Sequence, residues 1–127
     1  MQVYEQLITV TKDDLDELNH VNNVRYIQWI QDIAKAHWEQ NVTKNIKEIF
    51  FWVVVSHFIE YKSPAFLNDE IKIITYVTKS EGVTSIRIVE MYKNNKLLVE
   101  AKTTWCLLST STNRPARITQ EIVDLFN

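Results

Sequence analysis

The segment from Asn23 to Gln40 has the periodicity of an α-helix with an unusually wide apolar face. With successive residues spaced by 100°, one arc of roughly half the circumference collects the apolar side chains and one histidine. This arc contains Tyr26, Ile27, Trp29, Ile30, Ile33, Ala34, His37 and Trp38. Such a wide face would be exposed to water in an ordinary surface helix. The helix must therefore be wrapped by the rest of the chain.

The flanking sequence supplies strands to cover it. Short runs of alternating or β-branched and aromatic residues predict five strands and a short amphipathic C-terminal helix. The strands are expected at 2–10, 51–61, 70–78, 84–92 and 96–109, and the C-terminal helix at 119–126. One long helix followed by consecutive antiparallel strands indicates an α+β fold, with a curved five-stranded sheet around a central helix. We expect a single domain over residues 1–127.

Composition excludes several classes of protein. A chain of 127 residues with 46% apolar content can bury one core, and a net charge of −2 without a long basic run argues against nucleic acid as a partner. No apolar stretch approaches the ~20 residues that span a bilayer, and the N-terminus lacks a signal-peptide pattern. The single cysteine, Cys106, forms no internal disulfide and suits a reducing compartment. These features predict a soluble, cytoplasmic protein without membrane insertion.

Glycine is almost absent, with Gly82 the only one in the chain. Tight turns that need a positive φ must then use another residue, and asparagine tolerates that conformation best among the others.

A cluster of acids lies immediately before the long helix. Asp13, Asp14, Asp16 and Glu17 fall within five positions. Acids at this place commonly cap a helix and compensate its dipole. They also occur where a carboxylate performs chemistry, and residue type alone leaves both interpretations open.

The order of residues from Asp16 to Trp29 resembles a family signature. Asp16, Asn19, His20, Val21, Asn22, Asn23 and Tyr26 match Asp-x-x-Gly-His-Val-Asn-Asn-x-x-Tyr, with asparagine replacing the glycine. This signature is typical of hot-dog-fold thioesterases of the 4-hydroxybenzoyl-CoA thioesterase-like group. The segment is also similar to the Leu-Asp…His-Val-Asn-Asn-Val-x-Tyr-Ile-x-Trp run of acyl-ACP thioesterases.

Later segments extend the resemblance over the whole chain. Residues 60–69 resemble the family's Glu-Tyr…Pro-Ala…Leu-Gly-Asp loop, and residues 113–115 resemble the Gly-Arg-Pro that follows its last strand. Asn19, Asn68 and Asn113 stand where the family commonly has glycine. We therefore predict a positive φ at all three asparagines.

The resemblance implies a site around Asp16. This carboxylate would attack the thioester carbonyl or activate a water molecule that does so. The backbone N–H of Asn23, helped by that of Val24, would stabilise the negative oxygen at the helix N-terminus. His20 would either share in catalysis or only shape the turn. Asn22 and Asn23 are expected as caps and turn formers first and as substrate contacts second.

Further residues are candidates for contact with the substrate. Tyr26 and Trp29 lie on the apolar arc, where core packing and lining of an acyl pocket are equally expected. His57 is a candidate for facing the pocket across a subunit boundary. Lys62, Arg114 and Arg117 are candidates for binding the phosphates of coenzyme A, because the chain has no glycine-rich phosphate loop. His37 is expected to be a hydrogen-bonded core histidine.

Two departures from the acyl-ACP pattern favour coenzyme A as the carrier. The plant enzymes have an asparagine two residues before the histidine, where this chain has Leu18. Their Glu-Cys pair corresponds to Pro64 and Ala65. No residues have metal-ligand spacing, and no cofactor is expected beyond the coenzyme A that is part of the substrate.

The resemblance also implies an assembly. A single hot-dog sheet leaves a strand edge unpaired, and the family pairs two subunits edge to edge, with active sites at the interface. A homodimer or a homotetramer is expected. Three functions are considered, from the most to the least expected. They are an acyl-CoA thioesterase of lipid metabolism, an acyl-ACP thioesterase, and a non-catalytic acyl-thioester binder or dehydratase. The last is weakest, because no second acid matches the dehydratase motif.

Overall fold

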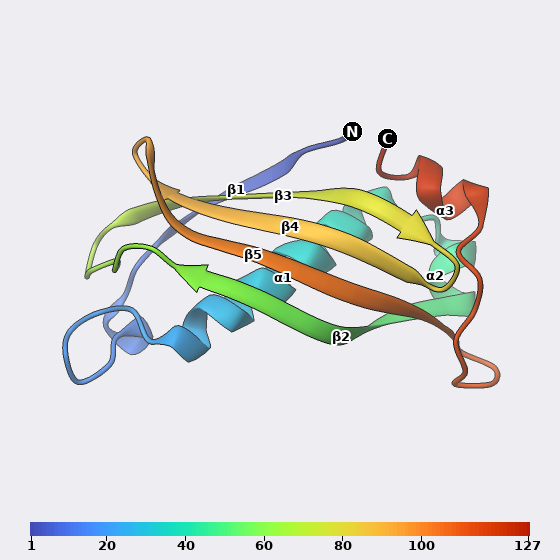
Figure 1. The fold of residues 1–127 in the computed structure, drawn as a ribbon, viewed down its shortest axis with the longest axis horizontal. Helices are drawn as coiled ribbons and strands as arrows, with labels where there is room; N and C mark the ends of the chain where they lie inside the picture. Colours follow the sequence, from blue (N-terminus) through green and yellow to red (C-terminus); the bar gives the residue numbers. More distant parts are fainter.

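In the computed structural model, which describes residues 1–127, a curved five-stranded antiparallel sheet surrounds one long helix (Figure 1). The elements are β1 (Tyr4–Thr9), a 3-10 turn (Lys12–Asp14), α1 (Asn23–Asn41), α2 (Lys44–Ile49), β2 (Phe50–Tyr61), β3 (Glu70–Glu81), β4 (Thr84–Lys93), β5 (Lys96–Ser109) and α3 (Gln120–Asp124). This is the predicted hot-dog fold. None of its helices has the length and apolar character needed to span a membrane.

The strands are ordered β1-β3-β4-β5-β2 across the sheet. Two hairpins join β3, β4 and β5, whereas β1 and β2 form the two edges. β2 pairs with β5 along its whole length, from Phe50 opposite Ser109 to Tyr61 opposite Val99. The other side of this 12-residue strand is unpaired.

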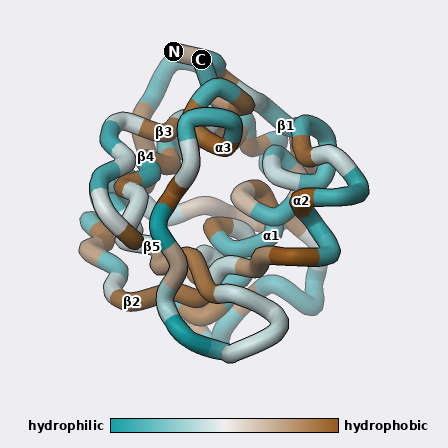
Figure 2. Tube along the Cα trace, turned by 90° about the vertical axis from the view of Figure 1, so that its right-hand side faces the viewer, coloured by the Kyte–Doolittle hydropathy of each residue, from teal (hydrophilic) through white to brown (hydrophobic).

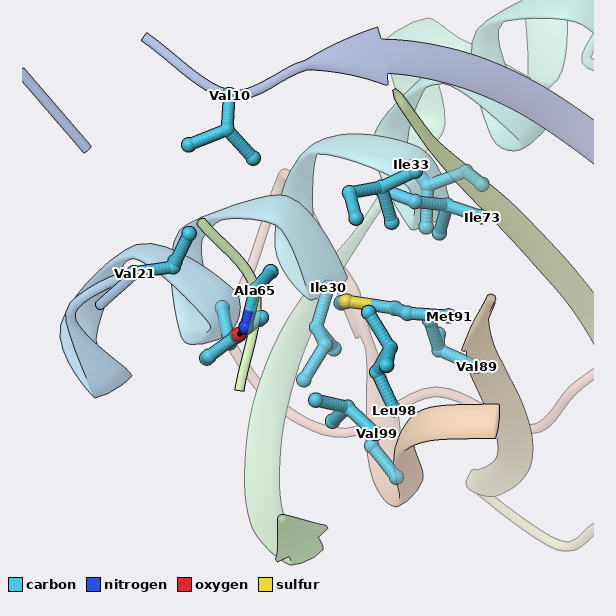
Figure 3. Packing of buried hydrophobic residues seen from close by; sticks show 13 residues of the cluster. Val10, Val21, Ile30, Ile33, Ala65, Ile73, Val89, Met91, Leu98 and Val99 are labelled. Atoms are coloured by element: carbon cyan, nitrogen blue, oxygen red, sulfur yellow. Dashed lines mark hydrogen bonds between the residues drawn. The ribbon is translucent and has the colours of Figure 1, made fainter. Parts of the chain in front are cut away.

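The wide apolar arc of α1 is buried as predicted. Tyr26, Ile30, Ile33, Ala34, His37 and Trp38 are all buried. Two separate clusters make up the core. The larger one has 13 buried residues, and within it Ile30 and Ile33 pack against the inward side chains of β3, β4 and β5 (Figure 3). The smaller one joins Trp38 to Ile46, Leu107, Ile122 and Phe126.

The two chain ends lie side by side next to the C-terminal half of α1. Figures 1 and 2 both show them together, and the backbone N–H of Gln2 donates to the carbonyl of Phe126 at 2.9 Å. The end-on view of Figure 2 shows α1 enclosed by the strands, with α3 near the chain ends. α3 thus covers one end of the space between helix and sheet.

Asparagine replaces glycine at the turns. The φ angles are 62° at Asn19, 70° at Asn68 and 58° at Asn113, which confirms the prediction for all three. The hairpin after β4 adds Asn94, with a φ of 55°. Every non-glycine residue with positive φ is therefore an asparagine.

Some boundaries differ from those predicted. The helix α2 was not predicted, because it buries only Ile46 and so has little hydrophobic periodicity. It begins after Thr43, whose hydroxyl accepts from the Ile46 N–H at 3.2 Å. β3 continues through Glu81, so the following turn lies at Gly82 and Val83. The C-terminal helix is shorter than the predicted range 119–126.

The left-handed conformation of Asn113 should distinguish substitutions at this position. Replacing Asn113 with alanine should lower the free energy of unfolding by about 1 kcal/mol, because a Cβ without a polar side chain is strained there. Replacing it with glycine should change that energy by less than about 0.5 kcal/mol, since glycine adopts positive φ freely. Urea unfolding of the two variants tests this. Equal stability of both variants would show that the backbone conformation at this turn is unimportant.

Candidate active site

The loop before α1 is closed upon itself. Leu15 and Val21 form an antiparallel bridge, and the Asp16 N–H donates to the His20 carbonyl at 2.8 Å. Asn19 makes the tight turn at the tip with its positive φ. The loop is thus a small hairpin that holds residues 16–20 in a defined shape at one end of the molecule, drawn in blue at the lower left of Figure 1.

Asp14 has the structural role that the acid cluster suggested. Its Oδ2 accepts from the backbone N–H of Thr11 at 2.8 Å, and its Oδ1 lies 3.0 Å from Nε of Arg25. Asp14 is buried, whereas Asp13 and Glu17 are exposed. Capping and ion pairing therefore account for Asp14.

Asp16 is held differently, by backbone amides on one oxygen only. Its Oδ1 accepts from the N–H of Leu18 at 2.9 Å and from the N–H of His20 at 3.2 Å. Its Oδ2 accepts no hydrogen bond from the chain, and the residue is half-buried. Two amide donors on Oδ1 orient the carboxylate while leaving Oδ2 free to react.

α1 begins at Asn23, seven residues after Asp16. Asn22 is the cap, and its Oδ1 accepts from the Val24 N–H at 3.0 Å, so this amide is already engaged. The Arg25 N–H donates to the Asn22 carbonyl at 2.9 Å. The Asn23 N–H has no acceptor in the chain, and no acidic residue in the first turn of α1 offsets the helix dipole. The Val24 amide is therefore occupied by the cap in this structure, whereas the Asn23 amide is free to donate.

The loop after β2 packs beside the acid loop. His20 contacts Phe66 edge to face, with ring centroids 5.2 Å apart, and its ring makes no hydrogen bond to Asp16. The Val21 N–H donates to the Ala65 carbonyl at 2.9 Å, and the Ala65 N–H donates to the hydroxyl of Tyr26 at 3.2 Å. Residues 63–69 thus support the shape of the acid loop, and His20 is positioned by packing.

Tyr26 and Trp29 belong to the core. Tyr26 is buried in the larger cluster, and burial raises the pKa of its hydroxyl. Trp29 packs against the same cluster, with its ring 5.5 Å from that of Tyr26. Of the two predicted roles, core packing is the one the structure supports.

The remaining predicted residues are dispersed. His57 faces the sheet interior, where its Nδ1 lies 2.8 Å from the Thr103 hydroxyl, its Nε2 is buried without a partner, and burial lowers its pKa. Lys62 follows β2 at the same end of the molecule as Asp16. Its Nζ lies 3.8 Å from Oε2 of Glu60. Arg114 and Arg117 are exposed in the segment after β5, at the opposite end of the molecule (Figure 1). A single chain therefore does not bring these two arginines to Asp16.

A cavity of about 470 Å³ lies between α1 and the sheet, beside the open edge of β2. Six of its 16 lining residues are aromatic: Trp38, Phe50, Phe51, Trp52, Trp105 and Phe126. Its volume is in the range of small-molecule sites. On α1, the residues that line the cavity run from Gln28, in the second turn, to Glu39. No three His, Cys, Asp or Glu side chains lie close enough to hold a metal ion.

A buried polar network at the inner side of this cavity was missed from the sequence. Arg87 donates from Nη1 to Nδ1 of His37 at 2.9 Å and to the Thr75 hydroxyl at 3.1 Å. Because arginine only donates, His37 must accept at Nδ1 and carry its proton on Nε2, which lies 2.6 Å from Oε1 of Gln2. The expectation of a hydrogen-bonded core histidine is confirmed. Burial and the nearby Arg87 charge lower the pKa of His37 to about 4.

The sequence signal for this network was the alternation in β4. Ser85, Arg87, Val89 and Met91 all point inward, so the arginine interrupts an otherwise mostly apolar face. A charged residue at such a position marks either a paired core charge or a binding site.

Comparison with known proteins agrees with this architecture. The model of the family described as the acyl-ACP thioesterase N-terminal domain matches residues 1–126. A search of curated proteins finds no match.

Several solved structures share the fold. The probable thioesterase YbaW from Escherichia coli is 22% identical, with 95% of this chain and 94% of that chain covered and a TM-score of 0.86. Slr0204, a 1,4-dihydroxy-2-naphthoyl-CoA thioesterase from Synechocystis, is 16% identical over 98% of this chain and 95% of its own, with a TM-score of 0.84. A Thermus thermophilus thioesterase complexed with coenzyme A and Zn is 19% identical over 96% and 90%, with a TM-score of 0.85.

The low pKa of His37 predicts a loss of stability in acid. Between about pH 4 and pH 6.5 the unfolded chain binds a proton at this residue and the folded chain does not, so stability falls as the pH falls. At about pH 5 this residue alone should lower the free energy of unfolding by about 2 kcal/mol relative to about pH 7. Urea unfolding at both pH values measures it. In the His37→Gln variant, which keeps an acceptor for Arg87 and does not titrate, this part of the loss should vanish. An identical pH dependence in both proteins would contradict the assignment.

Proposed function

Because this chain belongs to the acyl-ACP thioesterase N-terminal domain family, we propose that it hydrolyses acyl thioesters of coenzyme A, with Asp16 as the reacting carboxylate. One observation carries the proposal. Oδ1 of Asp16 is held by two backbone amides, Oδ2 is free, and the unpaired Asn23 N–H lies at the helix N-terminus that follows. A free carboxylate oxygen and an unpaired amide N–H are a base and an oxyanion donor, the two kinds of group that thioester hydrolysis uses.

The reaction can be written through Oδ2 of Asp16. As a general base, this oxygen takes a proton from water while the water oxygen attacks the thioester carbonyl carbon. The negative oxygen of the tetrahedral intermediate accepts from the Asn23 N–H, where the helix dipole adds about half a positive charge. Cleavage of the C–S bond then releases the acid, and the proton on Asp16 passes to the thiolate of coenzyme A. Direct attack by Oδ2 would use the same oxygen and the same amide, with an anhydride as intermediate.

Coenzyme A is the favoured carrier for two reasons. The extra acid and thiol of the plant acyl-ACP enzymes are replaced by Pro64 and Ala65, which leaves the simpler site around Asp16. Two proteins of the same fold were solved with coenzyme A, the Thermus thermophilus thioesterase and SAV2348 from Staphylococcus aureus. In the proposed complex, Lys62 would meet the carrier's phosphates on the Asp16 side of the site.

The open edge of β2 supports a homodimer. This edge strand exposes Val53, Val55, Phe58 and Tyr61, and an unpaired apolar strand favours pairing with another copy. The Phe50 end of β2 lines the cavity, whereas the Tyr61 end packs on Tyr26 near the acid loop. Antiparallel pairing about a two-fold axis would bring the Asp16 loop of one copy to the cavity of the other. It would also bring Arg114 and Arg117 of that other copy toward the first copy's Asp16.

An acyl-ACP substrate is the second candidate, and the family match favours it, because that family is described by its carrier protein. The two candidates share the phosphopantetheine arm and the acyl thioester, so the chemistry at Asp16 is the same. The two substrates differ in what would bind to the surface beside Lys62: the nucleotide of coenzyme A or the carrier protein.

Replacing Asp16 with asparagine should abolish hydrolysis while leaving the loop intact, because an amide oxygen still accepts from Leu18 and His20 but cannot take a proton. Release of free thiol from a panel of acyl-CoA substrates should fall by at least about 100-fold. The matched control is Asp13→Asn, which changes an exposed acid of the same loop and should keep the wild-type rate.

The same panel with acyl-ACP added separates the candidates. Faster release of thiol from acyl-CoA than from acyl-ACP supports the proposal. Release of thiol from acyl-ACP alone replaces it with the second candidate. If the wild type and Asp16→Asn are equally fast, the assigned mechanism is wrong. If neither releases thiol but both bind acyl-CoA, the chain is an acyl-thioester binder.

A charged side chain introduced on the edge strand β2 should prevent formation of the proposed homodimer. One chain has a mass of 15.0 kDa, and light scattering should give about twice that value for the wild type. Val55→Lys should give a single-chain mass and lose thiol release, because each site would lack the other copy's cavity. Leu7→Lys places the same charge on the opposite edge strand and should retain both properties. A single-chain mass with full activity in the wild type would reject the shared site.

A further inference from the structure

Arg87 is the one charged side chain on the inward face of β4, and it is only 6% exposed. It lies between the two apolar clusters, with its guanidinium 5.2 Å from the ring centroid of Phe126. Arg87 also lines the cavity between α1 and the sheet. The cavity thus has a buried cation at its inner side.

This cation has no counterion in the chain. None of the five ion pairs includes Arg87, and its two acceptors, His37 and Thr75, are neutral and both use Nη1. The Nε and Nη2 groups donate to nothing in the chain. Burial lowers the pKa of Arg87 to about 10, which leaves it charged at neutral pH. A buried charge without an opposite charge is costly, so its presence beside a cavity points to an anionic ligand.

A second donor of the cavity lacks a partner. Nε1 of Trp105 is buried and makes no hydrogen bond, and Trp105 lines the same cavity. Arginine and tryptophan side chains donate only, so a group bound by both must be an acceptor. A carboxylate is planar and can accept from two guanidinium N–H groups at once.

The charges around the cavity agree with this. Its lining contains the carboxylates of Asp32 and Glu39 and the cations of Lys35, Lys47 and Arg87, a balance of two negative and three positive charges. Lys47 pairs with Glu39, and the four residues other than Arg87 are exposed at the rim. Lys35 makes no ion pair either, but it is exposed to solvent, so Arg87 is the one unpaired cation of the lining that is buried.

We propose that the cavity takes an acyl group with a second carboxylate at its far end, which Arg87 binds with help from Trp105. This rests on the proposed function, since the acyl group is that of the thioester at Asp16. The aromatic walls would contact the hydrocarbon between the two ends. The substrate class is thus the coenzyme A monothioesters of dicarboxylic acids.

Matched substrates test the charge. Octanedioyl-CoA and octanoyl-CoA differ at the far end of an eight-carbon chain, where only the first has a carboxylate. Wild-type kcat/KM should favour octanedioyl-CoA by about 10- to 100-fold, the effect of one charge-assisted contact. In Arg87→Met, which keeps an unbranched apolar side chain but removes the guanidinium and its charge, that preference should disappear or reverse. Lys35→Met removes a cation from the rim instead and should keep it.

Binding without hydrolysis separates this inference from the proposed function. Three of the four tryptophans, Trp38, Trp52 and Trp105, line the cavity, so a ligand there should change the fluorescence. Free octanoate presents one carboxylate to Arg87 and should bind the wild type at least about 10-fold more tightly than octan-1-ol, which has the same chain and no charge. This holds even if no thioester is cleaved, in which case only the hydrolysis proposal fails.

The opposite results overturn the inference. Hydrolysis of octanoyl-CoA at the same rate as octanedioyl-CoA, or faster, would leave the thioesterase proposal standing and show that Arg87 is structural. Equal binding of octanoate and octan-1-ol to the wild type would also reject it, and that measurement does not depend on the folding of the Arg87→Met variant.

Discussion

The enclosure of α1 by the curved sheet is the constraint on which the other features depend. The helix buries an arc too wide for a surface helix, so its first half packs in the larger cluster and Trp38 packs in the smaller one. Its N-terminus must then emerge beside a loop that closes tightly, and its far half must share the interior with α3. The start of this helix therefore determines where the acid loop lies, and its C-terminal half forms one wall of the cavity.

Much of the fold could be predicted because its signals are local. The apolar arc of α1 and the alternation in β3 and β4 are properties of short windows, and they gave element positions within a few residues. The asparagines at positive φ could be predicted from the scarcity of glycine together with the family pattern. The helix α2 lacked such a signal, since a short helix with one buried residue is stabilised by its tertiary position rather than by its pattern.

The site divides in the same way. Asp16, Asn22 and Asn23 are close in sequence, so their arrangement follows from one turn and one helix start, and the motif identified them. Arg87 and His37 are 50 residues apart and meet only through the packing of α1 on the sheet. Arg114 and Arg117 show the converse: chemistry grouped them with Asp16, but within one chain the direction of β5 carries them to the other end, so only a second copy would bring them to the site.

The polar residues around Arg87 interrupt a core that apolar side chains could have filled. A neutral side chain of similar size would join the two apolar clusters and avoid burying a charge. The chain instead keeps a guanidinium with neutral partners, and it adds a histidine whose doubly protonated, charged form is disfavoured there. Natural sequences break local rules of this kind mainly where a site needs it. The break coincides with the wall of the cavity, so the same residues that weaken the core provide donors to whatever enters it.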